Sequence, residues 1–315
     1  MFQGMEYVLA VYEEQSFSKA AKKLFISQPS LSANIKRIEK RIGFSIFDRS
    51  TIPLTLTELG SAYVQSAQKM MQIEEDFVHY ISDYSNLKRG KLIIGGSSLF
   101  VSLVLPHVMA AFAKQYPDLE LDLVEETTLK LERMLRDGEI DLLLDNTVLD
   151  EAIFSRMDYV SEEIILAVPK SFAINQELTE YQLTSADFAD GKEYWNEVPT
   201  VPFEKFKDQE FVLLNEENDT GHRAIELCHE YGFEPKVIFN VEQQLTAYNI
   251  SASGMAISFV GDTLVRHIPE SNQIIYYRLK GKDMNRKIFL YWKKSRYLSK
   301  AMTAFIKLIE DNMRK

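Results

Sequence analysis

Cysteine is almost absent from this sequence. Cys228 is the single one in 315 residues, so no disulfide can form within the chain and a reducing compartment is expected. Long apolar runs are missing too: no stretch of about 18 apolar residues is present to span a bilayer. The opening residues 1–6 lack the basic and apolar regions of a signal peptide. These absences predict a cytoplasmic protein that does not enter a membrane.

A catalytic or metal-binding cluster is not recognisable either. Only His222 and His229 share a predicted helix, and their separation of seven residues suits one helix face but not one metal ion. Gly95 and Gly96 lack the rest of a dinucleotide-binding fingerprint. Cys228 is interpreted as a core residue on the apolar side of its helix, with a redox sensor as the alternative. The sequence therefore predicts no cofactor, no metal ion and no enzymatic activity.

Positive charge is scarce overall but concentrated near the amino terminus. The chain has 36 Lys and Arg against 46 Asp and Glu, for a formal net charge of -10. Residues 1–60 have eight basic and six acidic side chains, which leaves 28 and 40 in the remainder. Over residues 16–49 only Glu39 and Asp48 oppose all eight positive charges. Because phosphate neutralisation needs clustered Lys and Arg, this pattern predicts a DNA-binding module joined to an acidic domain.

The basic segment has the periodicity of three helices. Apolar residues recur every three or four positions over residues 5–12, and a short helix over residues 19–25 follows the capping candidates Ser16 and Ser18. A third helix is predicted over residues 30–41, after a capping serine and a proline in the first turn. Its outward face is small, polar and basic, which is typical of a helix-turn-helix that enters the major groove. The alternative is a three-helix packing unit with a solvated lysine face.

Two short strands are predicted next, over residues 44–47 and 55–57 on either side of Pro53. They complete a winged helix-turn-helix over residues 1–60. Amide and hydroxyl side chains can read base edges, whereas lysine and arginine mainly bind phosphates. The residues predicted to approach base edges are Gln28, Pro29, Ser30, Ser32 and Asn34. The residues predicted to bind phosphates are Lys36, Arg37 and Arg49.

A long linker helix is predicted over residues 58–88, after the capping residue Thr57. Aromatic and apolar residues recur along it at every seventh position, which is typical of a helix that packs against a partner helix. The residues of this predicted dimerisation seam are Tyr63, Met70, Phe77 and Tyr84. A homodimer would present two recognition helices to two DNA half-sites. The alternative is an amphipathic helix that packs on its own domain.

These amino-terminal residues resemble those of the LysR-type transcriptional regulators. About twenty positions agree in residue and spacing, at Phe17-Ser18-Lys19-Ala20-Ala21, Leu24, Ser27-Gln28-Pro29-Ser30-Leu31-Ser32, Ile35, Ile38-Glu39, Gly43, Phe47-Asp48-Arg49 and Leu56-Thr57-Glu58-Leu59-Gly60. Weaker matches continue at Leu105-Pro106, Ala111-Phe112, Tyr116-Pro117, Gly138-Glu139-Ile140-Asp141 and Ser253-Gly254-Met255-Ala256-Ile257. The resemblance implies promoter DNA and a small-molecule effector as partners of a homodimer, or of a tetramer. Three features depart from the family pattern: Ala33 replaces a long side chain, the wing over residues 50–54 lacks basic residues, and the segment over residues 186–207 is unusually long.

Residues 91–315 alternate predicted strands and helices, which is typical of a parallel sheet with helices on both faces. Helices over residues 99–114 and 178–188 are among them. The strands and helices form two α/β sets, and the chain passes from one set to the other twice. This arrangement resembles type II periplasmic binding proteins. The first lobe is predicted over residues 91–162 and 268–315, and the second over residues 163–267. The predicted fold class is thus α/β, with a winged helix-turn-helix, a linker helix and a two-lobed effector domain.

Four predicted helix amino termini follow strands of these lobes. Their free N–H groups and nearby polar side chains suit a polar effector bound between the lobes. The predicted effector-binding residues are Ser97, Ser98, Thr128, Asn218, Thr220 and Gln243. The alternative is that these side chains only cap their helices. Acidic residues near these helix ends would repel an anion, so a cationic or zwitterionic effector is an alternative. They are Glu125, Glu126, Glu216 and Glu217.

Three classes of function compete for this sequence. A DNA-binding transcriptional regulator that responds to a small molecule is favoured. A solute-binding module without a role in transcription is the alternative, and the absent signal peptide and the basic helix count against it. An enzyme on the same two-lobed fold would need a nucleophile, a base or a cofactor set that the sequence does not show. Salt-dependent binding to promoter DNA separates the first class from the others.

Overall fold

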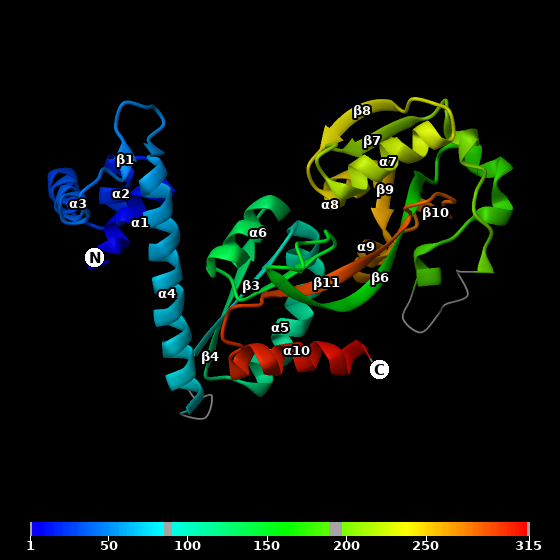
Figure 1. Ribbon diagram of the computed structural model, residues 1–315. Coiled ribbons are helices and arrows are strands. Elements are labelled where there is room, and N and C mark those ends of the chain that lie inside the picture. Colours follow the sequence, from blue (N-terminus) through cyan, green and yellow to red (C-terminus); the bar gives the residue numbers. More distant parts are fainter. Residues whose placement is uncertain (1, 85–89, 189–196, 314–315) are drawn as a thin grey trace. The chain divides into compact units, whose positions relative to one another are not determined.

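The computed structural model describes residues 2–84, 90–188 and 197–313. The chain divides into two compact units, residues 1–84 and 85–315 (Figure 1). Each unit has its own apolar core. Over the described ranges, no helix is both long enough and apolar enough to cross a membrane.

The first unit is a winged helix-turn-helix extended by a long helix, as predicted. Its elements are α1 (Met5–Glu14), α2 (Phe17–Lys23), α3 (Gln28–Ile42), β1 (Phe47–Asp48), β2 (Thr55–Leu56) and α4 (Glu58–Tyr84). Ser27 caps α3 by accepting a hydrogen bond from the Ser30 N–H at 3.3 Å, and Pro29 lies in the first turn. Because the cap is Ser27, the helix begins at Gln28, slightly before the predicted start.

The core of this unit joins all four helices. It includes Val8 from α1, Leu31 from α3 and Tyr63 from α4. Gly60, in the first turn of α4, lies so close to the wing that a Cβ atom there would be 1.9 Å from the Ile46 carbonyl oxygen. The start of α4 therefore depends on a residue without a side chain.

The second unit is built on one continuous sheet. Its strands are β3 (Gly90–Gly96), β4 (Leu119–Glu125), β5 (Leu142–Asp145), β6 (Phe154–Pro169), β7 (Glu210–Leu214), β8 (Lys236–Val241), β9 (Ile257–Gly261), β10 (Ile274–Arg278) and β11 (Asn285–Lys293). The order is β4-β3-β5-β11-β6-β9-β7-β8, and β10 pairs with β6. Strands β3, β4 and β5 form a parallel set, called the first lobe, and β7, β8 and β9 form another, called the second lobe. The antiparallel pair β6 and β11 runs between them, which confirms the two lobes crossed twice by the chain (Figure 1).

Helices cover both faces of this sheet. They are α5 (Leu105–Gln115), α6 (Thr128–Asp137), α7 (Asp219–Glu230), α8 (Gln244–Ala252), α9 (Asp262–His267) and α10 (Lys300–Met313). In β5, Leu142 and Leu144 face the core shared with α5 and α10, whereas Leu143 faces the core beneath α6. Alternation along the strand therefore explains why its continuous leucine run is fully buried.

The boundary between the lobes differs from the prediction, which places residues 268–315 in the first lobe. β11 pairs with residues 154–163 of β6, and β10 continues along the same edge at residues 165–169. Tyr277 of β10 packs in the core of the second lobe. The chain returns to the first lobe only in β11, because the carboxyl-terminal half of β6 offers β10 a free edge.

Two predicted helices also differ. Residues 178–188 form short 3-10 turns, and Leu183 between them makes a β-bridge with Tyr276. The helix predicted over residues 99–114 contains a π-helical turn, Phe100–Val104, just before Pro106. Proline has no N–H to donate to the preceding turn, which favours such an irregularity.

The long segment over residues 186–207 lies partly outside the described residues, at positions 189–196. Phe203 and Phe206 in its last part are fully buried in the core of the second lobe. The Phe203 ring contacts five other aromatic rings, those of Phe206, Phe211, Tyr231, Phe233 and Phe259. This part of the segment therefore stabilises the second lobe.

Candidate DNA-binding surface and effector site

The amino-terminal part of α3 presents a polar surface. Gln28, Pro29 and Ser30 are exposed, and Ser32 and Asn34 are half-buried on the same helix. The opposite face of α3 is buried in the core of the first unit. The structure therefore brings together the five side chains predicted to approach base edges.

Basic side chains extend this surface along α3. Lys36 and Arg37 are exposed, and Arg37 Nη1 donates a hydrogen bond to Asn34 Oδ1 at 3.4 Å. Lys40 and Arg41 follow in the last turn, where positive charge interacts favourably with the helix dipole. Polar and basic groups thus share one helix, as a groove-binding helix requires.

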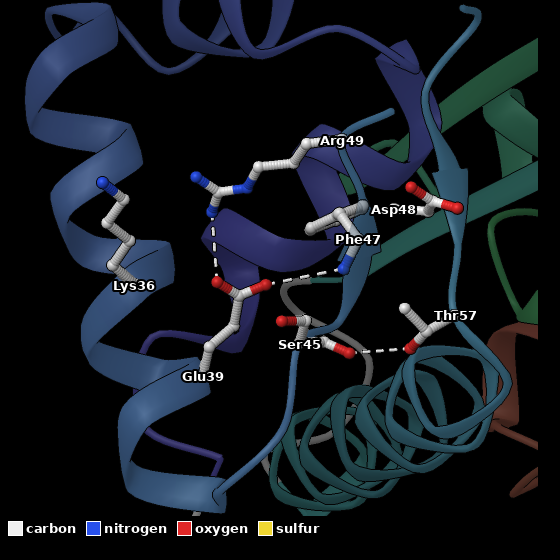
Figure 2. Close-up of a pocket in the computed structure, with 7 residues that line it drawn as sticks. All are labelled: Lys36, Glu39, Ser45, Phe47, Asp48, Arg49 and Thr57. Carbon is white, nitrogen blue, oxygen red and sulfur yellow. Dashed lines mark hydrogen bonds and ion pairs between the residues drawn. The ribbon is translucent and has the colours of Figure 1, made fainter. Parts of the chain in front are cut away.

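Arg49 lies beside α3 although it follows strand β1. Figure 2 shows its guanidinium turned toward Glu39, with Nη2 at 3.1 Å from Glu39 Oε2. The guanidinium also lies 5.2 Å from the centre of the Phe17 ring. Glu39 Oε1 accepts a hydrogen bond from the Ile46 N–H at 2.9 Å. Glu39 therefore joins the recognition helix to the wing and positions Arg49.

A shallow pocket lies between α3 and the wing (Figure 2). It is lined by Lys36, Glu39, Ser45, Phe47, Asp48, Arg49 and Thr57. Hydrogen bonds from the Ser50 hydroxyl and N–H lower the pKa of Asp48, and its carboxylate points away from the Arg49 guanidinium, which turns toward Glu39 (Figure 2). The charges that line this side of the wing are therefore partly paired, since Arg49 forms an ion pair with Glu39.

Helix α4 has an exposed apolar face in its second half. Its members are Met70, Ile73, Phe77, Val78, Tyr80 and Ile81. The side chain of Phe77 is 61% exposed, whereas Tyr63 is 4% exposed and stacks on Phe2 with ring centres 5.1 Å apart. Tyr63 was predicted to lie in the dimerisation seam. It is instead buried within its own unit, because the first turns of α4 pack against α1 and β2. Tyr84 ends α4, and its side chain lies outside the described part of the chain.

In the first lobe, the predicted effector residues follow parallel strands. Ser97 and Ser98, after β3, are half-buried. Thr128 begins α6, and its hydroxyl donates to Asp145 Oδ2 at 3.0 Å. Burial raises the pKa of Asp145, while hydrogen bonds from Thr147 and Thr128 oppose the rise. The parallel strands β3, β4 and β5 bring these groups to one edge of the sheet.

In the second lobe, the predicted residues lie at the amino termini of α7 and α8. Asn218 is exposed and caps α7 by accepting a hydrogen bond from the Thr220 N–H at 2.9 Å. Gln243 is exposed before α8 and makes no side-chain capping bond. Thr220 is buried, and its Oγ1 accepts hydrogen bonds from Arg286 Nη1 at 2.9 Å and Gln244 Nε2 at 3.1 Å.

Arg286 on β11 joins the crossing strand β6 to the amino terminus of α7. Its Nε donates to Glu162 Oε2 on β6 at 2.6 Å, and its Nη1 donates to Asp219 Oδ2 at 2.7 Å. The charge of Arg286 also counteracts the burial that raises the pKa of Asp145. Thr220 in the second lobe therefore contacts this buried guanidinium, and Thr128 in the first lobe contacts Asp145, whose pKa the same charge affects.

Family models match nearly the whole chain. The model described as "Bacterial regulatory helix-turn-helix protein, lysR family" matches residues 2–61, and the model described as "LysR substrate binding domain" matches residues 85–314. The chain belongs to the LysR family. As a LysR-type transcriptional regulator, it binds DNA and responds to a small-molecule effector, as the sequence predicted.

Relatives of this LysR-type regulator match over most of their lengths. The uncharacterized HTH-type transcriptional regulator YcgK of Bacillus subtilis is 29% identical over 312 residues, covering 98% of this chain and 94% of the relative. A probable RuBisCO transcriptional regulator of Trieres chinensis is 26% identical over 313 residues, covering 96% and 94%. The family assignment therefore extends over both units.

Solved structures share the fold. CbnR, a LysR family transcriptional regulator, superimposes with a TM-score of 0.62 at 18% identity, covering 99% of this chain and 98% of that one. A full-length OxyR variant from Pseudomonas aeruginosa gives a TM-score of 0.67 at 21% identity, covering 100% and 94%. At these identities the likeness shows the fold alone.

Sequence reasoning missed the buried charges of this LysR-type regulator. Glu39, Asp145 and Arg286 are absent from the predicted sites, yet they contact the predicted residues Arg49, Thr128 and Thr220, respectively. Glu162, also absent, contacts Arg286. One sequence feature could have indicated such a buried charge. It is a charged residue at the end of an apolar strand, as in Asp145 after three leucines. Such a residue is rarely buried unless it has partners.

Proposed function

We propose that this LysR-type regulator reads its promoter with the amino-terminal half of α3, through Gln28, Pro29, Ser30, Ser32 and Asn34. Lys36, Arg37 and Arg49 bind the flanking phosphates. The observation that carries this proposal is the single face of α3 on which polar and basic side chains lie together. Such a helix fits the major groove, and its amides and hydroxyls can read base edges.

Gln28→Ala is expected to weaken binding to the cognate promoter by about 1–3 kcal/mol and to relax base preference, because an amide reads a donor and acceptor pattern. Lys36→Ala is expected to weaken cognate and random DNA alike and to flatten the salt dependence by about one unit. Gel-shift titrations at several salt concentrations measure both effects, on a promoter found by genomic footprinting.

The matched control is Lys114→Ala, which removes the same charge from an exposed site on α5 in the second unit. It should leave both the affinity and the salt slope unchanged. Wild-type affinity of Gln28→Ala for the cognate promoter would show that another surface reads the bases. Absence of any salt-dependent DNA binding by the wild-type protein would refute the proposed DNA-binding surface.

We also propose that a small polar effector binds between the lobes. Its contacts are Ser97, Ser98 and Thr128 in the first lobe and Asn218, Thr220 and Gln243 in the second. The network around Arg286 supports this location, because it links the crossing strand β11 to the amino termini of α7 and α8, near which the second-lobe residues lie. Since the Thr128 hydroxyl donates its proton to Asp145, it would accept a hydrogen bond from the ligand.

Ser98→Ala and Thr128→Ala are each expected to lower effector affinity roughly tenfold to hundredfold. Each removes one or two hydrogen bonds worth about 0.5–1.5 kcal/mol, and up to about 3 kcal/mol with a charged partner. DNA binding without effector should persist, because the first unit is unchanged. Promoter output measured against effector concentration checks the result.

Thr179→Ala, which truncates an exposed threonine elsewhere in the second lobe, is the control and should respond like wild type. A wild-type dose response in both Ser98→Ala and Thr128→Ala would place the effector elsewhere. Loss of DNA binding in both variants would mean that the two hydroxyls are structural. The expected result is that the promoter stays bound but no longer responds to the effector. Such a response exists only if the effector binds two conformations of the protein with different affinities.

We propose that the regulator forms a homodimer through the apolar face of α4. A tetramer is the alternative assembly. Each protomer contributes one recognition helix, so that a dimer contacts two half-sites. The proposed location is the cytoplasm, because promoter DNA is the partner.

A further inference from the structure

Arg286 is a buried cation whose two sides differ. Its side chain is 3% exposed. On the inner side lies Glu162, whose side chain is fully buried and bonded to Nε at 2.6 Å. On the outer side lies Asp219, whose side chain is 29% exposed and bonded to Nη1 at 2.7 Å. Asp219 therefore lies between the buried guanidinium and solvent.

Asp219 is also held by a second arginine and by its place in the helix. Arg223, one turn further along α7, donates from Nε to Asp219 Oδ2 at 2.8 Å. Asp219 is the first residue of α7, where the positive end of the helix dipole favours a negative charge. Burial acts to raise the pKa of Asp219, but hydrogen bonds and charges from Arg223 and Arg286 outweigh it and leave this pKa below its ordinary value.

Asp219 supplies one of the two carboxylates that form ion pairs with Arg286. Arg286 and Arg223 supply two positive charges, and Glu162 and Asp219 supply two negative ones. Without the Asp219 carboxylate, Arg286 keeps Glu162 as its ion-pair partner and Arg223 loses its ion pair with residue 219, beside the Thr220 hydroxyl that contacts Arg286. Two guanidinium groups at hydrogen-bonding distance from one carboxylate are what an anion site provides.

We propose that Asp219 is a built-in anion that fills this site and determines effector specificity. The inference rests on the proposed function, because Asp219 lies between the proposed effector contacts Asn218 and Thr220. A ligand carboxylate or phosphate at this corner would have to displace Asp219 and would meet its repulsion. The effector therefore presents a neutral or cationic group, such as an amine, to this corner of the second lobe.

The test removes the Asp219 carboxylate by substitution and then adds a small anion. In Asp219→Ala, acetate should bind between Arg286 and Arg223 and raise the unfolding temperature saturably. We expect a rise of roughly 3–5 °C at an acetate concentration about ten times its Kd. Chloride at matched ionic strength serves as the reference, and wild type should show no saturable rise. If Asp219→Ala does not fold, Asp219→Ser keeps a small helix-starting residue and should show the same response.

Glu217→Ala is the matched control, because it removes an equal charge from an exposed residue two positions earlier. It should behave like wild type. An acetate response of the same size in wild type or in Glu217→Ala would overturn the proposal, since the anion would then bind elsewhere. No response in a folded Asp219→Ala or Asp219→Ser protein would overturn it as well. These measurements need neither DNA nor effector, so their failure is distinguishable from failure of the proposed function.

Discussion

Replacing Phe77 with glutamate is expected to convert this regulator largely to monomers. Phe77 lies on the exposed apolar face of α4, and in a dimer a glutamate there would enter a desolvated seam without a partner. The penalty is several kcal/mol for each buried, unpaired charge. Because both protomers carry the change, the dimer suffers it twice. Sedimentation velocity measures the shift to the monomer.

DNA binding should weaken along with dimerisation, because a monomer contacts only one half-site. Gel-shift titration with a two-half-site promoter measures this loss. Gln65→Glu is the control, since it adds the same charge to an exposed position of α4 away from the heptad seam. An unchanged dimer in Phe77→Glu would move the interface away from α4, to a surface of the second unit.

The heptad pattern of α4 could predict an apolar seam but not what covers each part of it. Tyr63 and Phe77 occupy equivalent positions of the repeat, yet Tyr63 packs inside its own unit and Phe77 is exposed. A periodic pattern reports only that one face is buried against something. The covering partner depends on tertiary contacts, here those of α4 with α1 and β2.

Helix ends were predictable because they depend on neighbours in sequence. Ser27 caps α3 and Asn218 caps α7, and in each case the hydrogen bond joins residues two or three positions apart. The position of β10 was not predictable in this way. Its partner residues in β6 lie more than one hundred positions away, and either lobe could accept so short a strand.

The charged residues of the effector region were missed for the same reason. Arg286 and Glu162 are 124 positions apart, and Arg286 and Thr220 are 66 positions apart. Taken singly, Arg286 and Glu162 have the charged side chains expected of surface residues. Only the pairing of β6 with β11 brings them together, so the sequence indicates where a ligand would meet helix ends but not which charges surround it.

Breaking the buried ion pair between Asp141 and Arg296 is expected to cost the second unit about 3–5 kcal/mol of its free energy of unfolding. Both side chains are 4% exposed, and Arg296 Nη2 lies 2.7 Å from Asp141 Oδ1. Asp141 Oδ2 also accepts a hydrogen bond from the Ile93 N–H at 2.7 Å. In Asp141→Ala, Arg296 would keep its bonds to the Gly138 and Ile140 carbonyls but lose the charge that balances it.

Chemical denaturation measured by circular dichroism tests this expectation. Asp141→Asn keeps an oxygen acceptor for Ile93 and removes only the charge, so it should lose less stability than Asp141→Ala. Glu125→Ala, at an exposed end of β4, is the control and should change the free energy of unfolding by less than about 0.5 kcal/mol. A loss below about 1 kcal/mol in Asp141→Ala would mean that the buried pair does not stabilise the unit, as some buried pairs do not. A large loss in both Asp141 variants but not in Glu125→Ala would identify the pair as the link that holds the turn before β5 to the segment after β11.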